Sequence, residues 1–308
     1  MQQEEMNLKE FMDRFQTEEA CREHFFRLRW PEGFKCPKCG HEEYSFISRR
    51  NLYQCKSCAY QASLTAGTLM HRSRTGLREW FLAIFLFTHD KRGFSAAQLG
   101  RTLGVSHDTA WLMLHKLREA MGVRDEEYIL KGIVEVDDAF FGGPSEDGKR
   151  GRGTSKTPAI IAVSLNEDGN PSYVKIEVVE RVNGATIVET VKAMTEPGSV
   201  IRTDGLSSYN ALGKEGYEHQ AEIFDPENRP EHLRWLHVIV SNLKAFIAGT
   251  YHGLEKKHLQ RYFNEFCYRF NRRRFGNQLF NRLLSVCASM TTTITYSQLV
   301  GKTAETSR

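Results

Sequence analysis

Four cysteines near the N-terminus have the residue type and spacing of a metal site. Cys36 and Cys39 form one CxxC pair, and Cys55 and Cys58 form a second pair after 15 intervening residues. Four thiolates at this spacing are typical of tetrahedral structural zinc, which leaves no open position for catalysis. Four unrelated reduced cysteines are the alternative, but two matching pairs rarely arise by chance. The sequence therefore predicts a structural Zn2+ site.

Two aspartates could hold a second kind of metal. Asp137 lies in the apolar stretch Ile133–Phe141, and Asp204 follows the stretch Ser199–Thr203. A carboxylate inside a β-branched strand is disfavoured by propensity and by desolvation. Hard divalent ions prefer oxygen ligands, and two such ions can activate the nucleophile and stabilise the leaving oxygen of a phosphodiester. We expect a shared cation, although Asp204 before Gly205 is also a plausible turn residue.

Strand alternation separates the neighbours of Asp137. Successive side chains point to opposite faces, so Asp137 and Asp138 cannot both face the same site. Glu135 shares a face with Asp137 and is therefore expected to support the site without binding the metal directly.

A helix-turn-helix motif is expected over residues 95–118. Gly104 permits a sharp turn after an amphipathic helix, and Ser106 can cap the next helix. The first residues of the second helix of such a motif meet base edges in the major groove. DNA contacts are accordingly expected from Ser106, His107, Asp108 and Thr109, with Lys116 and Arg118 available for phosphates. An ordinary helical hairpin that binds nothing is the alternative.

The elements after residue 126 indicate an α/β fold. Ile133–Phe141 and Ser199–Thr203 read as strands, and Pro158–Leu165 with Tyr173–Val179 read as a hairpin. Helical spacing extends over Asn183–Met194, His232–Gly249 and Leu254–Arg273. Strands followed by a helix and another strand predict a mixed sheet. The expected domains are a helix and zinc ribbon (1–75), a helix-turn-helix domain (76–125), a catalytic domain (126–290) and a polar tail (291–308).

Composition is compatible with a globular, DNA-binding protein. The 308 residues are 40% hydrophobic and 26% charged, with a net charge of +4. Basic residues cluster in 149–156 and 269–274, where Arg272 and Arg273 could grip a DNA backbone, although a solvated helix face is the alternative. The glycine-rich and basic segment 145–157 is expected to be a loop, either one that orders on DNA or a plain flexible one. No leader or membrane span is evident, which predicts a cytoplasmic protein. The remaining cysteines, Cys21, Cys267 and Cys287, are expected to be buried.

The order of these motifs resembles a known family. After the cysteine pairs and the helix-turn-helix come Val134-Glu-Val-Asp-Asp-(x)3-Gly-Gly143, Thr203-Asp-Gly205 and Gly249-Thr-Tyr-His-Gly253, followed by the long block 257–273. Together they resemble insertion-sequence transposases with a DDE-type, RNase H-like core, the bacterial group related to the eukaryotic Merlin elements. The resemblance covers about residues 10–290.

The resemblance implies catalytic roles. Asp137 matches the first aspartate of the family triad and Asp204 the second. The third position, usually acidic and twelve residues before the Gly-Thr-x-His block, is occupied here by His237, with Lys244 seven residues later. His237 would either bind Mg2+ or Mn2+ or orient the nucleophile or leaving group, and Lys244 would contact phosphate near the cut. Asn242 is a weaker candidate for the third ligand.

The implied activity is metal-dependent DNA transposition. The helix-turn-helix would bind the terminal inverted repeats of the element, and the core would cut each end and join it to target DNA. Double-stranded DNA and a homodimer or larger assembly are the implied partners. Two alternatives stay open, namely a DNA-binding regulator that has lost activity and a metal-dependent nuclease that does not transpose.

Overall fold

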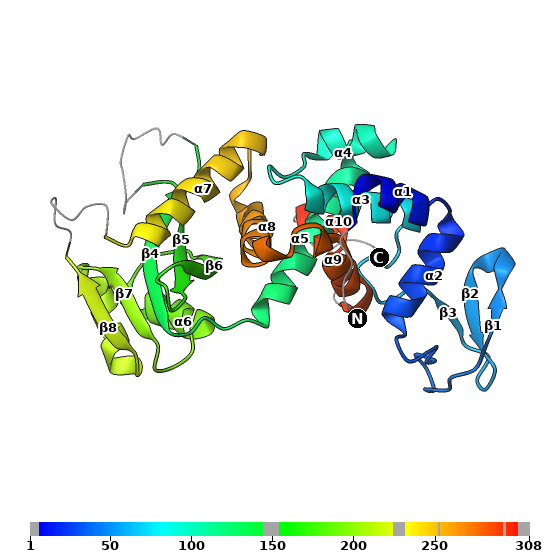
Figure 1. Cartoon of the computed structure of the whole chain (residues 1–308), viewed down its shortest axis with the longest axis horizontal. Helices are drawn as coiled ribbons and strands as arrows, with labels where there is room; N and C mark the ends of the chain where they lie inside the picture. Colours follow the sequence, from blue (N-terminus) through cyan, green and yellow to red (C-terminus); the bar gives the residue numbers. More distant parts are fainter. Residues whose placement is uncertain (1–5, 144–153, 224–231, 252, 292–293, 301–308) are drawn as a thin grey trace, which may run out of the picture. The chain divides into compact units, whose positions relative to one another are not determined.

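The computed structural model describes residues 6–143, 154–223, 232–251, 253–291 and 294–300, and it divides into two compact units (Figure 1). The first unit combines Met1–Met121 with Phe275–Arg308, and the second unit spans Gly122–Arg274. The described residues include no helix that is both long and apolar enough to cross a membrane.

The first unit is mainly helical. Its aromatic centre gathers Phe11, Phe15, Phe81 and Phe85 around Phe280, with ring centroids 4.5 to 6.0 Å apart. The elements of this unit are α1 (Leu8–Arg14), α2 (Glu18–Arg29), β1 (Tyr44–Ile47), η1 (Ser48–Arg50), β2 (Leu52–Cys55), β3 (Gln61–Ser63), α3 (Leu77–His89), α4 (Ala96–Leu103), most of α5 (His107–Glu126), α9 (Leu279–Ser289) and α10 (Tyr296–Val300).

Helix α9 corrects one expected boundary. Residues 275–290 were expected in the catalytic domain, yet α9 packs against α2 and α3 in the first unit. The reason is its apolar face, on which Phe280, Leu283 and Leu284 are fully buried. The expected polar tail also contains the short helix α10, whose Leu299 is buried; residues 301–308 lie outside the described residues.

The expected helix-turn-helix is present as α4 and α5. Gly104 ends α4 in the left-handed region with φ of 69°, where a side chain would be strained. The Ser106 hydroxyl then accepts a hydrogen bond of 3.2 Å from the backbone N–H of Thr109, which caps the first turn of α5.

The second unit is built on a five-stranded mixed sheet with the strand order β6-β5-β4-β7-β8. β4 (Ile133–Phe141), β5 (Thr157–Leu165) and β6 (Pro171–Val178) are antiparallel neighbours, whereas β7 (Val200–Asp204) and β8 (Glu218–Glu222) continue parallel to β4. This is the α/β, RNase H-like arrangement expected from the sequence. Its helical elements are α6 (Gly184–Met194), η2 (Ser207–Glu215), α7 (Arg234–Thr250), η3 (Lys256–His258) and α8 (Leu259–Asn271), and η4 (Arg273–Gln278) spans the boundary with the first unit.

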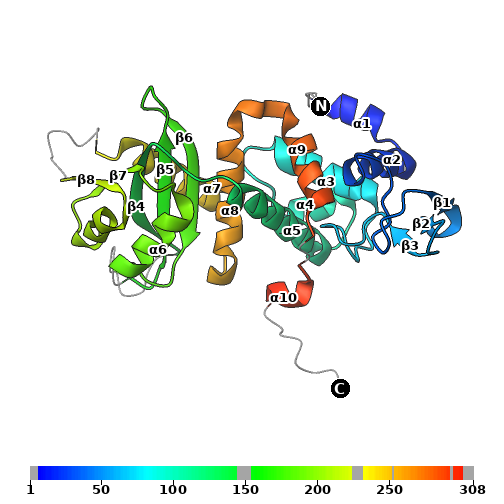
Figure 2. The same cartoon turned by 90° about the horizontal axis from the view of Figure 1, so that it is seen from below.

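Helices cover both faces of the sheet. Alternate residues of β4, including Ala139 and Phe141, pack toward α7 and α8, while Val134 and Val136 pack toward α6 and η2. The ribbon shows α7 on one side of the sheet and α6 on the other (Figure 1, Figure 2). Asp137, which alternates in phase with Ala139, therefore faces the α7 side.

Candidate functional site

Asp137 and Asp204 are aligned on adjacent parallel strands. β4 and β7 pair Ile133 with Val200 and Glu135 with Arg202, where the paired register ends. Continued by two residues, the same offset places Asp137 level with Asp204. Aligned residues of parallel neighbours point to the same face, so both carboxylates lie on the α7 side. The two aspartates singled out from the sequence thus share one face of the sheet, near the carboxyl ends of their strands.

Helix α7 presents His237 and Lys244 on this side. Both side chains, with Val240 between them, line a cavity of 330 Å3 together with Asp137 and Lys156. The spacing of three, four and seven residues places these α7 positions on one helical stripe. The structure therefore brings Asp137, His237 and Lys244 to one cavity, whereas Asn242 and Asp204 do not line it.

The N-terminus of α7 is attached to β4 through Glu135. The buried Glu135 carboxylate accepts a hydrogen bond of 2.8 Å from the backbone N–H of Leu236, one of the N–H groups that a helix start leaves without an internal partner. Burial raises the pKa of Glu135, and the Leu236 N–H opposes that shift. Glu135 thus fixes the helix turn that carries His237.

Asp138 faces the opposite side of the sheet, as strand alternation requires. Its Oδ1 accepts a hydrogen bond of 3.2 Å from the Tyr209 hydroxyl. Tyr209 is fully buried, and burial together with the charges of Asp137, Asp138 and Asp204 raises the pKa of its hydroxyl. The Asp138 carboxylate is therefore tied to the η2 side of the fold, although Asp138 also contributes to the lining of the 330 Å3 cavity.

The surroundings of His237 lower its pKa and so favour its neutral form. Desolvation lowers the pKa of this exposed helix residue, and the His232 ring, 6.0 Å away between centroids, lowers that pKa further. A neutral imidazole has a lone pair that can bind a metal or accept a proton. A Glu222 carboxylate oxygen lies 3.9 Å from His232 Nδ1, and another lies 3.9 Å from Arg202 Nε. An acidic group therefore lies beside His232, the neighbour of His237.

The carboxylates are not preassembled around one point. Among the described residues, the four ribbon cysteines alone form a group of three or more potential ligands within 4.8 Å of one another. Asp137 Oδ1 accepts the backbone N–H of Asp138 at 2.7 Å, and Asp204 Oδ1 accepts that of Leu206 at 3.2 Å. Binding one cation with Asp137, Asp204 and His237 together thus requires side-chain rearrangement.

The four cysteines match the geometry of zinc. Cys36 and Cys58 sulfurs are 3.6 Å apart, as are those of Cys39 and Cys55, and all four lie within 4.8 Å. A tetrahedral site with Zn–S bonds of about 2.3 Å separates its sulfurs by about 3.8 Å. The antiparallel β1–β2 hairpin brings the two pairs together. Cys21, Cys267 and Cys287 are buried, as expected.

The start of α5 is exposed, but two residues farther along are not. The side chains of His107 and Asp108 are 62% and 76% exposed, and Ser106 is exposed beside them. Lys116, by contrast, is buried and its Nζ donates to the Leu69 carbonyl at 3.0 Å. Arg118 is 1% exposed, with its guanidinium 5.5 Å from the Phe87 ring centroid. The expected phosphate contacts of Lys116 and Arg118 are therefore wrong, because α5 turns these residues into the core.

Arg272 is also a structural residue. Its buried guanidinium pairs with the buried Asp125 carboxylate and lies 3.9 Å from the Tyr268 ring centroid. The expected DNA contact of Arg272 is wrong, because its charge is satisfied inside the unit. Arg273 is exposed, although it donates to the carbonyls of Pro171 and Ser172. The expected loop at 145–157 lies largely outside the described residues.

Sequence reasoning missed several residues of this region. Glu222 is paired with Asp204 in the β7–β8 ladder, but the segment Glu218–Glu222 has no apolar alternation that would reveal a strand. Lys156 lines the same cavity as Asp137 and lay within the segment noted only as a basic loop. The sequence pattern predicts a helix that begins at His232, but it does not indicate that the His232 ring lies near the His237 ring.

Comparison with known proteins gives two domain matches. Residues 129–271 match the ISXO2-like transposase domain, and residues 16–61 match the transposase zinc-ribbon domain. The first match contains Asp137, Asp204, His237 and Lys244, and the second contains all four ribbon cysteines.

Two individual proteins are also similar. An uncharacterized protein in transposable element ISH50 of Halobacterium salinarum is 26% identical over 207 residues, covering 61% of this chain and 68% of that protein. The structure of the Mos1 transposase paired-end complex with left transposon end is 12% identical, with a TM-score of 0.24, over 68% of this chain and 79% of that chain.

Proposed function

We propose that this chain is an ISXO2-like transposase with an N-terminal zinc ribbon, and that it binds the ends of its mobile element and cuts and joins DNA at Asp137 and Asp204. The observation that carries the proposal is the alignment of these two carboxylates on adjacent parallel strands, on the face where α7 presents His237 and Lys244. Carboxylate oxygens suit Mg2+ or Mn2+, and such ions supply nucleophile activation and charge neutralisation during phosphodiester cleavage.

The proposed reaction consists of two successive displacements at phosphorus. In the first, water attacks the phosphorus at the element end, the P–O3′ bond breaks, and a 3′-hydroxyl and a 5′-phosphate form. In the second, that 3′-hydroxyl attacks a target phosphodiester and displaces the target 3′-oxygen. Asp137 and Asp204 would hold the ions. Neutral His237 either completes their ligand set or orients the nucleophile or leaving group, and Lys244 contacts the phosphate.

DNA recognition is assigned to the first unit. The residues at the start of α5, exposed at Ser106, His107 and Asp108 and half-buried at Thr109, would read the terminal inverted repeats. The zinc ribbon would brace or extend that contact, with Zn2+ held by Cys36, Cys39, Cys55 and Cys58. Two ends must be brought together, so a dimer or larger assembly on double-stranded DNA, in the cytoplasm at the nucleoid, is part of the proposal.

One observation favours a second candidate, a DNA-binding regulator without catalysis. Asp137, Asp204 and His237 do not converge within the distances of a preformed metal site among the described residues, and the third position is not acidic. A regulator would bind element ends but would not need the carboxylates to meet.

A strand-transfer assay separates the two candidates. The full chain is incubated with labelled duplexes of the DNA that flanks its gene, with target DNA, and with Mg2+ or Mn2+. The transposase proposal predicts cleaved and joined products from the wild type, and end binding without products from Asp137→Ala. End binding by the wild type without cleavage in any divalent ion would establish the regulator, and cleavage without joining would indicate a nuclease.

A further inference from the structure

A second cavity adjoins the candidate catalytic cavity. It has a volume of 540 Å3 and lies between the end of β4, the C-terminal half of α7 and the turn that leads into α8. Phe140, Lys156 and Lys244 line both cavities. A molecule bound at Lys244 would therefore have direct access to the second cavity.

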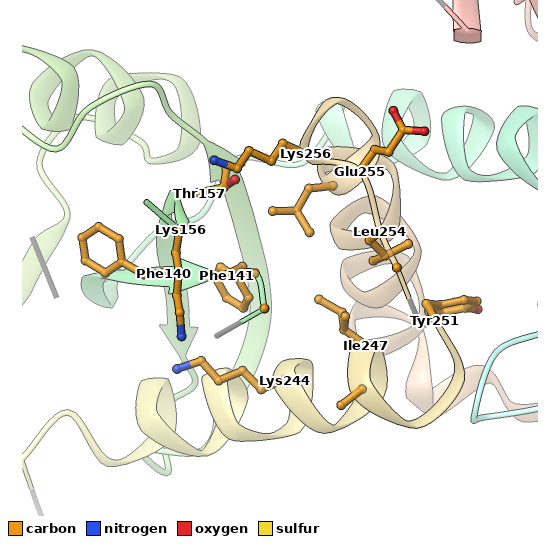
Figure 3. A pocket seen from close by; sticks show the side chains of 15 residues that line it. Phe140, Phe141, Lys156, Thr157, Lys244, Ile247, Tyr251, Leu254, Glu255 and Lys256 are labelled. Carbon is orange, nitrogen blue, oxygen red and sulfur yellow. The ribbon is translucent and has the colours of Figure 1, made fainter. Parts of the chain in front are cut away.

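The walls of this cavity are mainly apolar and aromatic. Phe141 and Tyr251 are 4% and 7% exposed, and Ile247, Leu254 and Leu259 complete the lining between them. In Figure 3 the side chains of Phe141, Ile247 and Leu254 project toward the same space. Such a surface suits a flat, weakly hydrated ring, because aromatic and aliphatic side chains stack on or enclose the faces of a nucleobase.

The mouth of the cavity is basic. Lys156, Lys244 and Lys256 all line it, and the Lys156 and Lys244 amino groups point to the same side in Figure 3. Lys256 Nζ donates to the Ser155 carbonyl at 2.6 Å, which ties the turn to the start of β5. Among the described residues that line the cavity, the one acidic residue is Glu255, which pairs with Lys257 at 2.8 Å. An apolar interior behind a cationic rim complements a nucleotide, which joins an apolar base to an anionic phosphate.

We infer that this cavity receives one nucleobase turned out of the DNA duplex beside the phosphate that is cut. Lys244 and Lys156 contact the backbone phosphates, and the base of the adjoining nucleotide lies against Phe141, Ile247 and Leu254. Turning a base out costs unstacking and unpairing energy, which the enclosing cavity offsets. The inference rests on the proposed function. It gives the second cavity a role in DNA binding that is separate from the role of the metal-binding residues.

The test uses 2-aminopurine, whose fluorescence rises when it leaves the base stack. It is placed in turn at each nucleotide around the cut in duplexes of the element end, and each is mixed with the full chain. The matched variants are Ala248→Trp, which fills the cavity from α7, and Ala245→Trp, the same change at an exposed position of α7 that does not line it. One position is expected to brighten with the wild type and with Ala245→Trp, but not with Ala248→Trp.

Cleavage provides the second measurement. Filling the cavity is expected to slow cleavage about tenfold or more without loss of end binding, since base–aromatic stacking contributes on this scale. An abasic nucleotide at the bright position should restore cleavage by Ala248→Trp, because no base then needs the cavity. Cleavage by the wild type with no position brightening would overturn the inference and leave the transposase function intact. Failure of the wild type to cleave any end would instead overturn the proposed function and the inference with it.

Discussion

The Glu135 carboxylate accepts a hydrogen bond of 2.8 Å from the backbone N–H of Leu236, the residue that precedes His237. β4 carries Asp137, a proposed metal ligand. Through Glu135 the same strand also fixes the turn of α7 that carries His237. The connection makes Glu135 a positioning residue, since it faces the α7 side together with Asp137 but acts through the backbone of α7.

Replacing Glu135 should separate positioning from binding. Glu135→Ala removes an anionic acceptor at a helix N-terminus and is expected to cost about 1 kcal/mol of stability. We also expect slower cleavage of element ends and a higher Mn2+ requirement, with partial rescue by Glu135→Gln, whose amide oxygen still accepts. An unchanged dependence of the cleavage rate on Mn2+ concentration in Glu135→Ala would rule out the positioning role.

The lowered pKa of His237 predicts how the cleavage rate falls at low pH. Because burial and His232 both disfavour its protonated form, His237 is neutral at pH 7, and cleavage should fall only below the ordinary histidine pKa of about 6.5. His232→Gln removes the neighbouring ring that can become positive, so the pKa of His237 should rise and the loss of cleavage should begin at higher pH. The measurement is the pH–rate profile of both proteins, and coincident acid limbs would contradict this assignment.

The helix-turn-helix offers a contrast between exposed and buried residues of α5. His107→Ala removes an exposed side chain from the proposed reading surface and should weaken binding to the element end about tenfold, with unchanged binding to random DNA. Lys116→Ala removes a buried donor to Leu69 and should lower the thermal stability of the first unit. The two variants are compared by DNA titration and by melting. The same loss on both DNA sequences in His107→Ala would argue against base reading.

The buried pair between Arg272 and Asp125 should matter for folding. Arg272→Ala leaves a buried carboxylate without its cation, and such losses cost about 3–5 kcal/mol. Burial itself raises the pKa of Asp125 even with the guanidinium present. Urea unfolding should show a large loss in Arg272→Ala, a partial recovery in Arg272→Ala with Asp125→Asn, and little change in Arg274→Ala, an exposed neighbour. Equal stability of Arg272→Ala and Arg274→Ala would show that the pair is dispensable.

The fold was predictable wherever the apolar pattern was regular. Ile133–Phe141 was expected as a strand, and β4 has those bounds because its alternate residues enter two different cores. Asn183–Met194 was expected as a helix, and Asn183 is the N-cap of α6. β8 was missed because its residues, Glu218–Glu222, are polar and gain their strand conformation from pairing with β7.

The candidate site residues come from motif order, and the structure adds their surroundings. Asp137, His237 and Lys244 line one cavity, while their catalytic roles stay predictions. Charge alone misled at Lys116, Arg118 and Arg272, because the sequence does not show which face of a helix is buried. The neighbours Lys156 and Glu222 depend on strand pairing between distant segments, which no local pattern encodes.

If Asp137 and Asp204 hold the divalent ions of a DNA-cutting site, a change of ligand chemistry at Asp204 should change which metal supports cleavage. Asp204→Cys replaces a hard oxygen with a soft sulfur, which binds Mg2+ poorly and Mn2+ or Cd2+ better. We measure cleavage of element-end duplexes by this variant in each metal, with Thr203→Cys, the buried neighbour of Asp204 on the opposite face of β7, as the control. We expect Asp204→Cys to lose cleavage in Mg2+ and to recover it in Mn2+ or Cd2+, and we expect no such metal-dependent recovery for Thr203→Cys. Cleavage by Asp204→Cys in Mg2+ at the wild-type rate would mean that Asp204 holds no metal ion.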